Sequence, residues 1–321
     1  MLLAACAAPS ERHRFVEAHM GTEFRIVVDA DSAELAAAGA RAAFARIAAL
    51  DAELSDWKSD SELSRLSRQP QGVPMTLGED LCSVLTRAAE IRAATDGAFD
   101  VTVGPFVVLW RRAVREGELP TEARLRTAAR AVGGDVLQLH AQDRSAVITV
   151  PHARLDLGGI AKGRAADEAL RELAKLGLTR ALVDGGGDLA VGDPPRDAEG
   201  WIVALQPLEE GKEPSEAVCV ARCGIATSGD LFQFVEIGGE RYAHIVDPRT
   251  GLGVRGRRTA TVIAQDGTTA DALASACCVL DPEAALAAVA RVPGATAMVR
   301  RAGSEGVITV HSPDFPALVH R

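Results

Sequence analysis

Pairs of strands separated by single helices are the feature of this 321-residue chain that most limits its fold. Residues 14–29 alternate in the manner of a strand pair, and residues 32–55 form an alanine-rich amphipathic pattern with helical spacing. Strand pairs and interspersed helices continue along the chain without the regular strand–helix–strand rhythm of a doubly wound sheet. We therefore expect an α+β fold of mixed, largely antiparallel sheets with packed helices, in a single compact unit.

Hydrophobic periodicity and turn residues predict the remaining elements. Helices are expected within residues 77–97, 98–114, 119–132, 160–177, 269–280 and 282–292. Strands are expected within residues 136–141, 146–150, 180–193, 200–207, 217–230, 234–248, 257–266, 296–301 and 306–312.

The charge of the chain restricts the ligands that it can attract. The sequence has 44 acidic residues against 35 lysines and arginines, which gives a formal net charge of −9. Because binding to a nucleic acid needs clustered basic residues, we expect no nucleic-acid partner. An anionic ligand would have to be held by local features such as helix N-termini, glycine-rich backbone amides or a bound cation.

The N-terminal residues bear on location. Leu3 to Cys6 read LAAC, the shape of a bacterial lipoprotein processing site whose cysteine is acylated, although the preceding parts of a signal peptide are missing. We interpret residues 1–13 as a residual signal segment or a tail, and residues 14–321 as the domain. The expected location is periplasmic or otherwise extracytoplasmic, with a lipid anchor at Cys6, or cytoplasmic if Met1 is the genuine start.

Other features of the chain give no sign of a membrane span or of disulfides. No other segment reaches the roughly 18 apolar residues of a membrane span, so a membrane contact is expected only through such an anchor. The six cysteines show no Cys-x-x-Cys spacing, which favours buried thiols.

The stretch DLGGIAKGRAADEAL, from Asp156 to Leu170, places glycines and a lysine where a strand leads into a helix. Its spacing is neither that of a P-loop nor that of a dinucleotide-binding loop. Gly158 and Gly159 permit close backbone approach, and the helix that follows offers unpaired amides and a positive dipole end. Lys162 lies in the first helical turn, where the dipole favours acidic residues. The stretch alone fits an anion site and a plain turn with a solvated lysine equally well.

The stretch DGTTADALASACCVL is a candidate metal site. In a helix, Asp271 and Ser275 are separated by four residues and lie on one face, so a carboxylate and a hydroxyl oxygen point the same way. Hard oxygen ligands of this kind suit Mg²⁺. The alternative is structural, with Asp271 at the helix start and Ser275 bonded back to a carbonyl oxygen.

Two glycine-containing stretches complete the set of motifs. His244 precedes the turn signature DPRTG on a predicted strand, and a structural histidine is the alternative there. VDGGGDLAVGD places three glycines between two strands, followed directly by Asp188, and a glycine bulge is the alternative.

Taken together and in this order, these motifs resemble those of the ApbE family, the FAD:protein FMN transferases. The similarity extends to MGTEFRI, LSDWKSDSELSRLS, GAFDVTVGPFVVLW and IATSGD, so it covers residues from about 20 to 280. The resemblance implies an ApbE-like fold related to the T-fold.

The resemblance also implies an activity and a set of site residues. The enzyme would cleave FAD at its pyrophosphate with Mg²⁺, attach FMN through a phosphoester to a threonine or serine of an acceptor flavoprotein, and release AMP. The metal would be held by the backbone oxygen of Ala161 and by Asp271 and Ser275, where serine replaces the family's threonine. The expected FAD-binding residues are Trp57, Gly158, Gly159, Lys162, Gly186, Gly187, Asp188, Ser228 and His244.

Trp57 and Asp184 depart from the family pattern. Trp57 stands where the family commonly has tyrosine, and its larger face would stack on the isoalloxazine ring. Asp184 stands where asparagine is more usual, and we assign it no role in binding because its charge would repel phosphates.

The catalytic groups follow from the chemistry of pyrophosphate cleavage. Mg²⁺ on Asp271, together with Lys162 and the loop amides, would neutralise the pyrophosphate, and we hypothesise that His244 takes the proton of the acceptor hydroxyl. Two alternatives remain: a Mg²⁺-dependent FAD pyrophosphatase that releases free FMN and AMP, and a non-catalytic flavin-binding lipoprotein.

Overall fold

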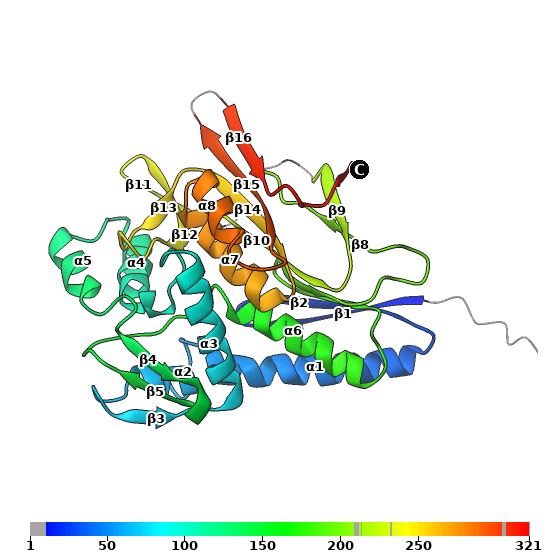
Figure 1. The fold of residues 1–321 in the computed structure, drawn as a ribbon, viewed down its shortest axis with the longest axis horizontal. Coiled ribbons are helices and arrows are strands. Elements are labelled where there is room, and N and C mark those ends of the chain that lie inside the picture. The colour runs from blue at the N-terminus through cyan, green and yellow to red at the C-terminus, as the bar shows by residue number, and fades with distance from the viewer. Residues whose placement is uncertain (1–10, 209–211, 213, 232, 304–305, 321) are drawn as a thin grey trace, which may run out of the picture.

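The centre of the molecule is an eight-stranded sheet in which neighbouring strands are antiparallel (Figure 1). This computed structural model describes residues 11–320 except 209–211, 213, 232 and 304–305. From one edge to the other the strands are β1 (Glu11–His19), β2 (Thr22–Ala30), β6 (Ala181–Gly185), β7 (Asp188–Val191), β10 (Cys223–Gly229), β14 (Arg258–Ala264), β15 (Thr296–Gly303) and β16 (Gly306–His311).

Helices cover one face of this sheet and form the main hydrophobic core with it. Helix α1 (Ala33–Leu54) runs beside α6 (Ala161–Lys175), and α6 packs against α7 (Gly267–Val279), which lies on β10 and β14 (Figure 1). The other helices are α2 (Glu62–Ser67), α3 (Glu79–Ala94), α4 (Gly104–Glu116), α5 (Glu122–Ala129) and α8 (Pro282–Val289), with short 3₁₀ turns at Val101–Val103 and Ala141–Asp143.

The opposite face of the central sheet packs on a three-stranded sheet. This second sheet consists of β17 (Leu318–His320), β9 (Glu216–Val220) and β8 (Trp201–Ala204). Along β7, Leu189 and Val191 belong to the core between the two sheets, whereas Ala190 between them belongs to the helical core. This division follows from the two-residue period of a strand.

Two smaller sheets complete the fold. One contains β3 (Pro74–Thr76), β5 (Ser145–Ile148) and β4 (Leu137–His140), and the other contains β11 (Phe234–Ile237), β12 (Glu240–Val246) and β13 (Gly253–Arg255). Helix α4 packs on the second of these through a separate apolar core, in which the rings of Trp110 and Tyr242 lie 5.4 Å apart.

The α+β class with largely antiparallel sheets and packed helices is therefore confirmed. Helix α2 was not expected, because its segment is polar. It forms because Ser61 caps its start, accepting a hydrogen bond from the amide of Ser64 at 3.0 Å, and because Leu63 and Leu66 are buried.

The N-terminal expectations are covered only in part by the structure. Strand β1 begins at Glu11, three residues before the predicted strand pair, whereas Cys6 lies outside the described residues. Among the described residues, no helix is both long and apolar enough to span a membrane. Cys82, Cys277 and Cys278 are buried free thiols as expected, but Cys219 is exposed, so that expectation is wrong there.

Helices α6 and α7 approach each other closely at a glycine. A methyl group on Gly163 would collide with the backbone carbonyl of Gly267 and would lie 2.9 Å from the Cβ of Asp271. The missing side chain therefore sets the distance between the two helices.

We expect Gly163→Ala to destabilise the fold. Alanine is normally better than glycine inside a helix by about 1 kcal/mol, but the collision with backbone atoms should outweigh this gain and cost about 3 kcal/mol. Urea denaturation measures the difference, with Lys175→Ala at the exposed end of α6 as the control. An unchanged or higher unfolding free energy for Gly163→Ala would contradict the close approach.

Candidate active site

Three charged side chains from separate elements meet beside the first turn of α6. The ammonium group of Lys162 donates a hydrogen bond to the Asp188 carboxylate, and Nζ lies 4.0 Å from Oδ1 of Asp271. Asp188 begins β7 and Asp271 lies in the second turn of α7, and both are nearly inaccessible to solvent, at 2% and 1% exposure. The fold therefore brings together three residues that the sequence placed in three different motifs.

The charges in this cluster shift one another's pKa values. Burial alone would lower the pKa of Lys162, but the carboxylates of Asp188 and Asp271 outweigh it and raise that pKa. Burial raises the pKa of Asp188, and the neighbouring charge of Asp271 raises it further, while Lys162 opposes both effects. Both partners hold protons more tightly than usual, and we assign the proton to lysine because an amine starts from the far higher pKa.

The loop before α6 differs from the anion cradle that the sequence suggested. The amide of Gly163 donates to Oδ2 of Asp271 at 3.0 Å, and the amide of Gly158 donates to Oδ1 of Asp156 at 2.8 Å. The expectation of unpaired amides at the start of the helix is therefore wrong at Gly163, because a carboxylate of the protein itself already accepts its hydrogen bond.

The glycine stretch between β6 and β7 is a tight hairpin turn that delivers Asp188 to the cluster. Gly186 and Gly187 have φ values of +70° and +100°, as the central residues of a type I′ turn require. Asp184 stabilises the turn, because its Oδ1 accepts a hydrogen bond from the amide of Gly187 at 2.8 Å. Its carboxylate is thus engaged within the turn.

Ser275, Ser228 and Gly159 lie together next to the charged cluster. The hydroxyl oxygens of Ser275 and Ser228 are 3.5 Å apart, and a methyl group on Gly159 would lie 2.9 Å from the Ser275 oxygen. The missing side chain of Gly159 therefore permits its backbone to pack against this hydroxyl group. Ala161, the first residue of α6, follows two residues later.

The donor atoms at this point fit a hard divalent cation. Asp271 supplies a buried carboxylate that already has a cation, Lys162, within 4.0 Å, and Ser275 supplies a hydroxyl oxygen one helical turn further along α7. Within the described residues, no three His, Cys, Asp or Glu side chains come together as a metal site. The predicted set does not depend on such a cluster, because its other donors are a hydroxyl and the backbone oxygen of Ala161.

His244 lies on β12 and is only partly covered by the surrounding protein. Its Nδ1 is 3.3 Å from the carbonyl oxygen of Gln233, so a proton on Nδ1 leaves Nε2 as the basic nitrogen. Desolvation by the surrounding protein lowers the pKa of His244, and the positive charge of Lys162 lowers it further. The lowered pKa favours the neutral imidazole, which is the form able to accept a proton.

Trp57 stands apart from the charged cluster, in the loop between α1 and α2. Its side chain is 75% exposed, and the guanidinium carbon of Arg111 lies 4.1 Å from the centre of its ring. Arg111 also donates a hydrogen bond to one carboxylate oxygen of Asp156, and the other oxygen accepts a hydrogen bond from the amide of Gly158. Sequence reasoning did not find Arg111 as a site residue, because the segment LWRRAV does not show which side chain the guanidinium group of Arg111 contacts.

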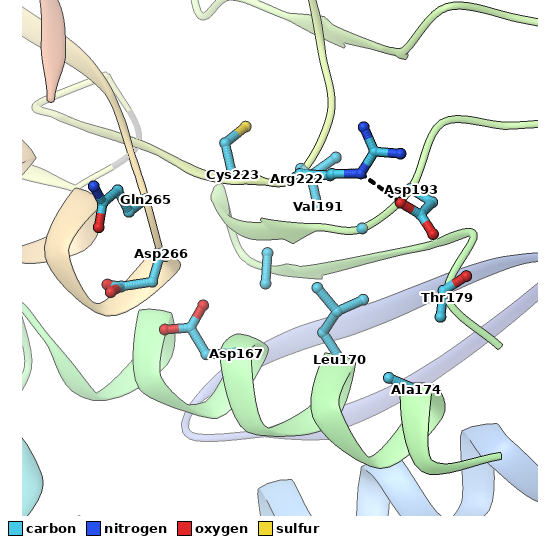
Figure 2. Close-up of a pocket in the computed structure, with 12 residues that line it drawn as sticks. Asp167, Leu170, Ala174, Thr179, Val191, Asp193, Arg222, Cys223, Gln265 and Asp266 are labelled. Atoms are coloured by element: carbon cyan, nitrogen blue, oxygen red, sulfur yellow. Dashed lines mark hydrogen bonds and ion pairs between the residues drawn. The ribbon is translucent and has the colours of Figure 1, made fainter. Parts of the chain in front are cut away.

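A hollow in the surface is lined by other residues. It is a cavity of about 340 Å³ between α6, β7, β10 and the start of α7 (Figure 2). Three of its charged side chains are engaged: Asp167 accepts hydrogen bonds from the amides of Gly267 and Thr268 at the N-terminus of α7, and Arg222 pairs with Asp193. Its lining, taken from the described residues, includes none of the residues assigned above to flavin or metal.

Comparisons with known proteins indicate the same family over most of the chain. The model of the ApbE family matches residues 20–299. A protein of Klebsiella pneumoniae named FAD:protein FMN transferase is 33% identical over 303 residues, which cover 92% of this chain and 86% of that protein. One of the same name from Haemophilus influenzae is 32% identical, covering 84% of this chain and 80% of its own length.

A solved structure is similar as well. The flavin transferase ApbE from Vibrio cholerae superposes with a TM-score of 0.84 at 27% sequence identity, covering 96% of this chain and 99% of its own. The likeness therefore extends over nearly the whole fold.

We expect Lys162→Met to make stability depend more steeply on pH. Without the ammonium group, Asp188 and Asp271 face each other buried and unpaired, which should cost about 3 kcal/mol or more at pH 8. Their pKa values would then lie further above those of the unfolded chain, so the folded state binds more protons and stability falls as pH rises.

Urea denaturation at pH 5 and pH 8 measures this effect. The deficit of Lys162→Met should be larger at pH 8 and should shrink when Asp188→Asn is added. Lys175→Met, whose exposed lysine pairs with Glu172, is the control. Equal deficits at the two pH values would show that the two carboxylates do not depend on Lys162.

Proposed function

The chain belongs to the ApbE family, and from this premise we propose that it is an FAD:protein FMN transferase. Its substrates are FAD and an acceptor flavoprotein, and its product is a threonine or serine of that acceptor that carries FMN in a phosphoester bond. AMP is the other product.

The cluster of Lys162, Asp188 and Asp271 is the observation that supports this proposal most directly. A pyrophosphate can be cleaved only where its negative charge is neutralised and its reacting oxygens are aligned. Lys162 provides a positive charge whose position is set by two buried carboxylates, and the net negative charge of the three groups calls for a divalent cation to complete the neutralisation. The backbone of Gly159 approaches the hydroxyl group of Ser275 more closely than a residue with a Cβ could.

We propose that Asp271, Ser275 and the backbone oxygen of Ala161 hold Mg²⁺. The side-chain donors, one buried carboxylate and one hydroxyl, are the hard oxygen atoms that this cation prefers. When bound, the cation supplies charge neutralisation and orientation at the pyrophosphate. Asp271 also ties α6 to α7 through the amide of Gly163, so its carboxylate is held rigidly for this role.

The remaining residues bind FAD and handle the proton. Trp57 stacks on the isoalloxazine ring, and Gly158, Gly159, Gly186, Gly187 and Ser228 line the path of its phosphates. The acceptor hydroxyl oxygen forms a bond to the phosphorus on the FMN side, and the bond from that phosphorus to the AMP oxygen breaks. His244 takes the hydroxyl proton on Nε2, and AMP leaves with the electron pair of the broken bond.

Incubation with FAD, Mg²⁺ and a purified acceptor flavoprotein tests the function. Covalent flavin fluorescence on the acceptor, with one AMP released for each flavin attached, is the expected result. AMP together with free FMN, and no label on the acceptor, would instead identify a pyrophosphatase. Bound but intact FAD would identify a binding protein.

We expect Asp271→Asn to abolish Mg²⁺ binding and the transfer that depends on it, while preserving the fold. Asparagine keeps an oxygen that can accept the hydrogen bond from Gly163 but lacks the charge that a cation needs. Transfer should fall about 100-fold or more, and titration calorimetry should show loss of Mg²⁺ binding. Asp281→Asn, at an exposed carboxylate before α8, is the control. Full transfer by Asp271→Asn would refute the metal assignment.

We expect His244 to determine the acid limb of the pH–rate profile. Its pKa lies below the ordinary value, so kcat/KM should rise with a midpoint below about 6.5 and be level at pH 7.5. In His244→Ala this limb should vanish, and the rate at pH 7.5 should fall by about 100-fold or more.

The control for this variant is His140→Ala, whose histidine is exposed on β4. FAD affinity is measured in both variants by equilibrium dialysis. If His244→Ala transfers FMN at the normal rate while it still binds FAD, the histidine has no part in the proton transfer.

A further inference from the structure

The guanidinium group of Arg111 lies at the junction of two parts of the candidate site. On one side it faces the ring of Trp57, with its central carbon 4.1 Å from the ring centre. On the other it forms two ion pairs, with Oδ2 of Asp56 at 2.6 Å and with Oδ2 of Asp156 at 3.2 Å. A planar guanidinium suits this arrangement, because it can stack through its face while its edge forms hydrogen bonds.

These contacts hold the otherwise exposed tryptophan in place. Trp57 is 75% exposed, and a side chain in that position would normally sample several rotamers. Arg111 comes from α4, which is anchored by the packing of the adjacent Trp110 against Tyr242. The position of the indole ring is therefore tied to a buried core rather than to its own loop.

Arg111 also connects the tryptophan to the loop before α6. Asp156 accepts the hydrogen bond from Arg111 on one carboxylate oxygen and the amide of Gly158 on the other, at 2.8 Å. The side chains of Asp56 and Asp156 are 11% exposed, so this connection lies largely out of water. The chain of contacts runs from the aromatic ring through the guanidinium to the glycine loop.

We propose that Arg111 is a positioning residue for FAD, which covers one face of Trp57 and leaves the other face for the isoalloxazine ring. The inference rests on the proposed function, because it takes FAD as the ligand. Arg111 acts through Trp57 and through the loop at Gly158. It does not bind the phosphates itself, since its guanidinium edge already serves two carboxylates.

This arrangement makes binding less costly. A side chain that is already ordered loses less conformational entropy when the ligand binds. A guanidinium group over an indole face adds an attraction that keeps the ring in that position. Because the same guanidinium fixes Asp156, the distance between the flavin-stacking face and the glycine loop is set before FAD arrives.

Arg111→Lys is the test variant, with Arg112→Lys as its matched control. Lysine keeps the positive charge beside Asp56 and Asp156, so the fold is preserved, but it loses the planar face and the two-way hydrogen bonding. Arg112 is the next residue on α4, is exposed, and pairs with Glu116 instead. The dissociation constant for FAD should rise about fivefold in Arg111→Lys, with kcat within about twofold, and should stay unchanged in Arg112→Lys.

Quenching of tryptophan fluorescence by acrylamide gives a readout that needs no ligand. Trp110 and Trp201 are only 2% and 6% exposed, so Trp57 dominates the quenching. Removal of the guanidinium cover should raise the quenching constant in Arg111→Lys and not in Arg112→Lys. Equal quenching in the two variants would overturn the proposed cover.

A double-mutant cycle with Trp57→Ala separates positioning from a general structural role. If Arg111 acts through Trp57, Arg111→Lys should add little to the loss of FAD affinity in the Trp57→Ala background. Fully additive losses, or normal FAD affinity in Arg111→Lys, would overturn the inference. If the unsubstituted protein binds FAD and shows this coupling but transfers no FMN, the proposed function fails while the inference stands. Absence of FAD binding overturns both.

Discussion

The attraction between Lys162 and two buried carboxylates is the interaction on which the candidate site depends. Asp188 and Asp271 have almost no contact with water, so their charges are tolerable only while a cation stays close. This requirement fixes the distances between the first turn of α6, the hairpin before β7 and the second turn of α7. Gly163 allows α6 and α7 to approach this closely, and the glycine hairpin turn places Asp188 beside Lys162.

A second group of contacts organises the flavin end of the site. The packing of α4 on β12 brings Arg111 beside Trp57, and the same strand carries His244 two residues after the buried Tyr242. Asp156 joins this group to the loop before α6 through the amide of Gly158. The charged cluster and the aromatic group are thus two separately packed units that share one loop.

Several features of the fold and the site could be predicted from local patterns. The strand pairs, the long helices and the hairpin before Asp188 follow from periodicity and from glycines that tolerate positive φ. The role of the loop amides could not be predicted in this way. The amide of Gly163 looked free because its acceptor, Asp271, lies 108 residues away and is recognised only when the helices are packed, whereas Asp156 accepts from Gly158 in a local turn.

The sequence by itself determined which residue types are present, which elements they form, and the order of motifs that identifies the family. Tertiary structure alone decided that Lys162 lies between Asp188 and Asp271, and that Arg111 lies on the ring of Trp57. The physical reason is the separation along the sequence over which each kind of interaction acts. Periodicity, capping and turn chemistry act over a few neighbouring residues, whereas these contacts join residues between 26 and 109 positions apart, whose approach depends on the packing of whole elements.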